Sequence, residues 1–168
     1  MSSDLRTILL SRDKPNMVQF LYDHPEFFND AISLALSDKQ PIAWRAAWAI
    51  GGTLPENAEK ISAFIPDILS KLSELQDGHQ REFIKILLQS DLDDDQQGQL
   101  FDICVTIWEQ VRKKASVRYF AFQVMADLVK KYPELSHEVL SLTQPQYINS
   151  LSPGIRQGVL KIMHQISE

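Results

Sequence analysis

One almost uncharged helical segment does most to constrain what this chain can fold into. Residues 41–52 have the sequence PIAWRAAWAIGG, and Arg45 is the only charged residue among them. A helix that is apolar nearly all round belongs inside an assembly of helices. Three further apolar segments carry an arginine at the matching place: Arg81, Arg118 and Arg156. The four arginines are 36, 37 and 38 residues apart. A regular interval of this length between helices predicts a stacked helical repeat.

Composition and charge narrow the class of protein. The chain has 168 residues, of which 44% are hydrophobic and 23% charged, as expected for one soluble globular domain with a substantial core. The net charge of −5 argues against nonspecific attraction to nucleic acid or to an anionic membrane. No run approaches the roughly 18 apolar residues of a membrane span, and no signal-peptide pattern opens the chain. We therefore expect a cytoplasmic protein.

Helical periodicity runs through the whole chain, whereas no stretch alternates with period two and no β-hairpin signal occurs. The sequence therefore predicts an all-α fold. Pro66 lies inside one expected helix and is predicted to kink it. Pro145 is predicted to divide the segment after residue 133 into two short helices. The expected helices cover residues 3–10, 15–22, 25–36, 41–52, 57–75, 79–89, 100–111, 117–131 and 133–142, and a last helix starts at 153.

One segment resembles a known repeat family. Residues 115–128, ASVRYFAFQVMADL, contain a hydrophobic residue, an arginine, two spacers and an alanine. This pattern resembles the second helix of HEAT repeats, in the ARM/HEAT superfamily. The resemblance covers about residues 25–168, with 1–24 as a degenerate leading hairpin. It implies a short right-handed α-solenoid of antiparallel hairpins, with about four repeats in a single domain over 1–168. Two other segments repeat the start of the pattern: Trp44-Arg45 and Ile155-Arg156.

The repeated arginines are interpreted as structural. An arginine where two hairpins meet can bind carbonyl oxygens or a neighbouring acid while its stem packs on apolar surface. The expected internal ladder consists of Arg45, Arg81, Arg118 and Arg156. At Arg81 the preceding residue is Gln80, where the other segments have a hydrophobic residue.

The acidic run at residues 91–95 is the most site-like stretch of the sequence. With Asp102 it resembles a calcium loop, but Gln96 stands where such a loop needs glycine. We expect instead that Asp93 caps a helix and that Gln96 completes a capping box. Cys104 lies on an apolar stripe, which indicates an inert core thiol.

The remaining chemistry-bearing residues form no motif. The four histidines are far apart and are interpreted as surface or turn residues without metal-ligand spacing. No phosphate loop and no hydrolase or metalloprotease motif occurs. The sequence therefore assigns no catalytic residue, no metal and no cofactor. It favours a non-catalytic role and leaves residual enzyme activity open.

The resemblance implies a concave binding surface lined by the second helices. If Val117, Ala121 and Val124 face inward, Tyr119 and Phe122 face the opposite way. Such a surface, with aromatic area and mixed charge, suits a protein or peptide segment. These aromatic rings also have an alternative role in packing against adjacent repeats, and we expect Phe122 to be structural and Tyr119 to face a partner. The expected partner-binding residues are Glu82, Lys85, Tyr119, Phe122 and Gln157.

The favoured function is therefore a non-catalytic protein- or peptide-binding scaffold of unknown partner. The alternative is a nucleic-acid-binding protein similar to HEAT-like DNA-alkylation-repair glycosylases. Those proteins have a basic concave face, whereas this chain is acidic. Basic residues at 112–114 and 130–131 offer a phosphate-binding edge, but complementing helix dipoles explains them without a partner. Phycobilisome lyases also carry HEAT-like repeats, yet nothing here matches a pigment site. Nucleic acid is thus disfavoured, and no membrane partner is expected.

Overall fold

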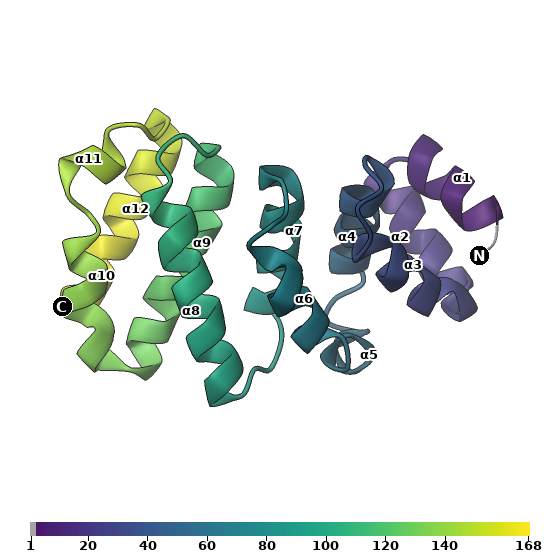
Figure 1. The fold of residues 1–168 in the computed structure, drawn as a ribbon, viewed down its shortest axis with the longest axis horizontal. Coiled ribbons are helices and arrows are strands. Elements are labelled where there is room, and N and C mark those ends of the chain that lie inside the picture. The colour runs from purple at the N-terminus through teal and green to yellow at the C-terminus, as the bar shows by residue number, and fades with distance from the viewer. Residues whose placement is uncertain (1–2) are drawn as a thin grey trace. The chain divides into compact units, whose positions relative to one another are not determined.

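The computed structural model describes residues 3–168, and every regular element in that range is helical (Figure 1). The all-α prediction is confirmed. The α-helices are α1 (Ser3–Ser11), α2 (Lys14–Asp23), α3 (Phe28–Ala35), α4 (Ile42–Gly52), α5 (Ala58–Ser62), α6 (Ile65–Leu72), α7 (Asp77–Leu88), α8 (Asp94–Glu109), α9 (Ala115–Lys131), α10 (Ser136–Ser141), α11 (Pro145–Ile148) and α12 (Pro153–Ile166). Two short 3₁₀ helices precede α3 and α10: η1 (Pro25–Phe27) and η2 (Pro133–Leu135).

The chain divides into two compact units, Met1–Asp91 and Leu92–Glu168. In the first unit, α4 packs against α1, α2, α3 and α7. In the second unit, α9 packs against α8 on one side and α12 on another. Each unit is thus built around one helix with neighbours on several faces. The single domain over residues 1–168 and the right-handed solenoid stay predictions.

Helix α4 is the buried centre of the first unit, as its almost uncharged sequence indicates. Ala43, Ala46, Ala47 and Ala49 are fully buried. Small side chains let neighbouring backbones come close, and the helix ends in two glycines. A β-carbon placed on Gly52 would lie 2.3 Å from Val18 Cγ2 of α2.

Helix α9 differs from the prediction because more than one of its faces is buried. The sequence suggests one inward stripe, but Phe122, Met125, Ala126 and Val129 are buried as well. The cause is that α9 has neighbours on several faces: α8, whose Trp108 packs on Phe122, and also α10, α12 and η2. A periodicity analysis that assumes one core face misassigns such a helix.

Pro66 and Pro145 lie in the first turns of helices. Pro66 does not kink one long helix, as predicted from the sequence; it lies in the first turn of α6, after α5 has ended at Ser62. Proline is favoured there because the first backbone N–H groups of a helix have no intrahelical acceptor. Pro145 starts α11 in the same way, and the predicted division of this segment is confirmed.

His79 is part of the core, not a surface or turn residue as the sequence analysis expected. Its side chain is 1% exposed in the first turn of α7. Nε2 donates to the Ala35 carbonyl at the end of α3 over 2.7 Å, and the Gln40 amide donates to Nδ1 over 3.0 Å. A neutral ring satisfies both bonds. Burial lowers the pKa of His79.

The close approach of α2 and α4 predicts opposite behaviour for two adjacent glycines. Gly52→Ala should lower the free energy of unfolding by about 1–2 kcal/mol, because β-branched Val18 cannot easily move away. Gly51→Ala is the matched control. Its β-carbon would lie 3.5 Å from Ile86, an ordinary contact, so helix propensity should keep or raise stability by up to about 1 kcal/mol. Urea melts compare the two, and equal midpoints would contradict the packing described.

The buried His79 predicts a pH dependence of stability. Because its folded-state pKa is lowered, the unfolded chain binds the proton more strongly. The stability that the neutral His79 ring contributes is complete above pH 6.5, the ordinary pKa of histidine. It is lost as the pH falls below that value. Urea melts between pH 7.5 and 5 should show stability declining in the wild type and less so in His79→Gln. The exposed His137 provides the control, and His137→Gln should retain the wild-type slope.

Candidate functional site

Arg118 is buried where three helices of the second unit meet. Its side chain is 1% exposed and lies 4.5 Å above the Trp108 ring. Nε donates to the Trp108 carbonyl over 2.9 Å, Nη2 to the Tyr147 carbonyl over 2.7 Å and Nη1 to Ser150 Oγ over 2.9 Å. The last carbonyls of a helix lack intrahelical donors. The guanidinium therefore joins the end of α8 to α11.

Two more of the repeated arginines make contacts of the same kind. Arg45 donates to the carbonyls of Leu9 and Arg12 at the end of α1. Arg156 donates to the Asn149 carbonyl over 2.9 Å, just after α11. Each guanidinium thus supplies donors to carbonyls that follow or end a neighbouring helix.

Arg81 does not join the expected ladder. It bonds Glu82 of its own helix over 3.0 Å and is about one-third exposed. The buried Gln80 takes the corresponding role, because its amide donates over 2.9 Å to the Leu72 carbonyl at the end of α6. The repeat position is therefore shifted by one residue in α7, and an amide replaces the guanidinium there.

Two of the five expected partner-binding residues are buried. Phe122 has no exposed surface and packs against Trp108 with ring centroids 4.8 Å apart, since α9 is covered on this face. Glu82 is 3% exposed and lies between Arg81 and Lys85. The Lys85 ammonium is 3.5 Å from the Glu82 carboxylate. Glu82 therefore lacks the exposed surface expected of a partner contact, whereas the burial of Phe122 agrees with the structural role that was also expected of it.

The other three expected residues reach the surface to different degrees. Gln157 is exposed, and Lys85 is about one-third exposed. Tyr119 is half-buried because its ring lies against Gly158 of α12, where an added β-carbon would be 3.0 Å from Cε2. The structure does not bring all five residues into one surface.

A basic cluster surrounds the buried Glu82 carboxylate in the first unit. Besides Arg81 and Lys85, it includes Lys14 of α2, whose ammonium lies 5.6 Å from the Trp48 ring centroid. Burial and the neighbouring Lys85 lower the pKa of Lys14, while Glu82 opposes that shift. The Glu82 carboxylate thus pairs with two cations of its own helix and acts through its charge on Lys14 of α2.

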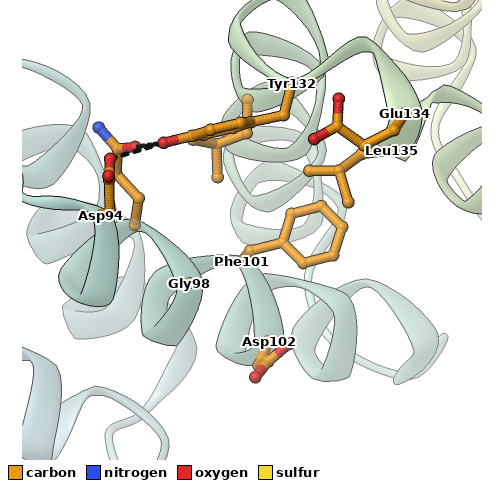
Figure 2. Close-up of a pocket in the computed structure, with 9 residues that line it drawn as sticks. Asp94, Gly98, Phe101, Asp102, Tyr132, Glu134 and Leu135 are labelled. Carbon is orange, nitrogen blue, oxygen red and sulfur yellow. Dashed lines mark hydrogen bonds between the residues drawn. The ribbon is translucent and has the colours of Figure 1, made fainter.

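The second unit contains a concave site that the sequence analysis did not predict, here named the α8–η2 pocket. Its volume is about 380 Å³, and it lies between the first half of α8, the end of α9, and η2. Figure 2 shows Phe101 and Leu135 pointing toward one another inside it. The lining residues are Asp94, Gln97, Gly98, Phe101, Asp102, Leu128, Tyr132, Glu134 and Leu135.

The start of α8 is fastened to the end of α9 beside this pocket. The Tyr132 hydroxyl donates to Asp94 over 2.7 Å, and Lys131 lies 3.2 Å from the same carboxylate (Figure 2 shows the tyrosine bond). Both contacts lower the pKa of Asp94, the tyrosine bond most. Lys131 and Tyr132 also bond Gln97. Asp94 is thus already engaged within the protein.

The acidic run forms a helix cap, as the sequence predicts. Asp93 accepts from the Gln96 backbone N–H over 2.8 Å, and the Gln96 side chain accepts from the Asp93 N–H over 3.1 Å. This capping box is confirmed. Cys104 is also buried as predicted, and burial raises the pKa of its thiol.

Gly98 is only a weak sequence signal for the pocket, because Gly78 and Gly154 are equally unobstructed and do not line it. It lies inside α8, where alanine is about 1 kcal/mol more favourable than glycine. A β-carbon placed there meets no atom within 4 Å, because the position faces open space. A helix-interior glycine that no neighbour requires is consistent with a cavity kept open.

The hairpins and their carbonyl-binding side chains define an all-α helical repeat protein. The HEAT repeat domain family matches residues 1–166, and the chain belongs to this family. Comparison with curated proteins and with solved structures found no match. None of the helices described for residues 3–168 is long and apolar enough to span a bilayer.

Removing the Arg118 guanidinium should be costly. Arg118→Leu keeps an apolar stem but leaves the Trp108 and Tyr147 carbonyls without their donors, so we expect a loss of about 2–3 kcal/mol of stability. Arg112→Leu is the control, and since that side chain is exposed it should cost under about 1 kcal/mol. Urea melts measure both, and equal losses would show that the carbonyl contacts of Arg118 contribute nothing special.

Proposed function

We propose that this protein is a non-catalytic scaffold that binds a segment of a partner protein at the α8–η2 pocket. The observation that carries the proposal is the pocket itself, an open hollow with an apolar floor in the second unit. Helical repeat proteins commonly present surfaces of this kind to other proteins.

The size and lining of the pocket support binding of a single anchoring side chain. Its volume of about 380 Å³ lies in the range of about 300–1,000 Å³ typical of ligand pockets. Phe101, Leu128 and Leu135 supply apolar contact area. A few anchoring side chains in pockets contribute most of the affinity of protein interfaces. Tyr119 and Gln157, which lie in the same unit but outside the pocket, stay proposed partner contacts of that unit, and Lys85 stays one within the first unit.

The charge of the pocket favours a protein partner over nucleic acid. Asp102 and Glu134 both line it, so a phosphate approaching the pocket is repelled. The chain as a whole carries a net charge of −5, which acts in the same direction.

Filling the pocket tests this function. Gly98→Leu places a side chain in the open space without a clash and adds helix propensity, so the variant should fold and remain at least as stable as the wild type. Peptides selected on the wild type from a random phage library should lose at least tenfold in affinity for Gly98→Leu. The control is Gly154→Leu in α12, which also meets no atom within 4 Å and lies outside the pocket.

Fluorescence anisotropy measures the affinity of each selected peptide for the wild type, Gly98→Leu and Gly154→Leu. Peptides that bind both leucine variants as tightly as the wild type would overturn the proposal that the pocket is the binding site.

A further inference from the structure

We infer that the partner segment is basic, and that a lysine or arginine side chain of that segment enters the α8–η2 pocket. This inference rests on the proposed function and specifies the partner's chemistry. It is based on two carboxylates in the pocket walls, Asp102 and Glu134, together with an apolar floor.

Two of the three carboxylates that line the pocket have no cationic partner within residues 3–168. Asp94 is engaged by Lys131 and Tyr132. The side chains of Asp102 and Glu134, by contrast, form no ion pair or hydrogen bond in this described part of the chain, and only the Asp102 backbone carbonyl accepts a bond, from Thr106. The pocket therefore carries two negative charges that its own fold leaves uncompensated.

These carboxylates come from different elements on either side of an apolar floor. Asp102 belongs to α8 and Glu134 to η2, whereas Phe101 and Leu135, their neighbours in sequence, point into the pocket (Figure 2). Each wall thus pairs one apolar side chain with one adjacent acid. The arrangement is apolar inside and negative at its edges.

Lysine and arginine side chains have the complementary shape. Their methylene stems bury against apolar surface while the charged end stays near the rim. An aliphatic side chain without charge fits the floor but leaves both acids unpaired, and an acidic side chain is repelled. Charge complementarity across an interface also selects against wrong partners.

Four blocked heptapeptides that differ only in a central lysine, arginine, norleucine or glutamate test the inference. Binding is followed by the NMR shift of the Gly98 backbone amide in the intact chain. The lysine and arginine peptides should bind at least tenfold more tightly than the norleucine peptide, and the glutamate peptide should cause no shift. Raising the salt concentration should reduce that difference, since the acids are exposed.

Matched variants attribute the preference to the two acids. Asp102→Asn combined with Glu134→Gln should bring the lysine and norleucine peptides within twofold of each other. The control is Asp127→Asn combined with Glu138→Gln, which removes two exposed acids outside the pocket and should keep the tenfold preference. Asp102→Lys combined with Glu134→Lys should transfer the preference to the glutamate peptide.

The outcomes distinguish this inference from the proposed function. Equal binding of lysine and norleucine peptides by the wild type, or no shift with any cationic peptide, overturns the basic-segment inference. The phage selection with Gly98→Leu judges the proposed function separately. Spermidine binding as tightly as the lysine peptide overturns the inference too, because the occupant is then a free polyamine.

Discussion

The structure depends on how helix ends obtain hydrogen-bond donors. The last carbonyls of each helix have no partner in their own helix, and burying them unpaired is costly. Arg118 supplies three donors at such a junction, and Arg45 and Arg156 act alike at theirs. In α7 the same need is met by neutral groups of Gln80 and His79. The feature that repeats along the chain is therefore a hydrogen-bond donor at a helix junction. Among these junctions, arginine supplies it most often.

That distinction explains how much of the fold the sequence predicts. The spacing of the arginines predicts a helical repeat because each lies in the first half of a long apolar helix. The same spacing wrongly places Arg81 at a helix junction. There the preceding Gln80 already donates to the carbonyl at the end of α6, and the Arg81 guanidinium pairs with Glu82 instead. The sequence also wrongly predicts that Pro66 kinks a helix, although a helix begins there. Apolar residues on both sides keep the same periodicity, so only the missing N–H shows that a helix begins there.

The candidate site is harder to predict, because it depends on which helix faces are covered. Phe122 and Tyr119 are three residues apart in α9, yet one is fully buried and the other half-buried. Their difference comes from α12 and Trp108, which no local pattern reveals. The α8–η2 pocket has the same difficulty. Asp102 and Glu134 are far apart in sequence, and only the pairing of α8 with the end of α9 places them around one hollow.

Arg118 and the α8–η2 pocket lie at opposite ends of the α8–α9 hairpin. Arg118, near the start of α9, holds the end of α8 through buried contacts. At the other end the hairpin is fastened by Lys131, Tyr132 and Asp94, and the Lys131–Asp94 pair is at least half exposed. Exposed pairs contribute little, so this end opens more readily than the buried one. The pocket walls combine the buried Phe101 with the exposed Asp102 and Glu134. The side chains of Asp102 and Glu134 form no ion pair or hydrogen bond within residues 3–168, so neither charge is used in that part of the fold.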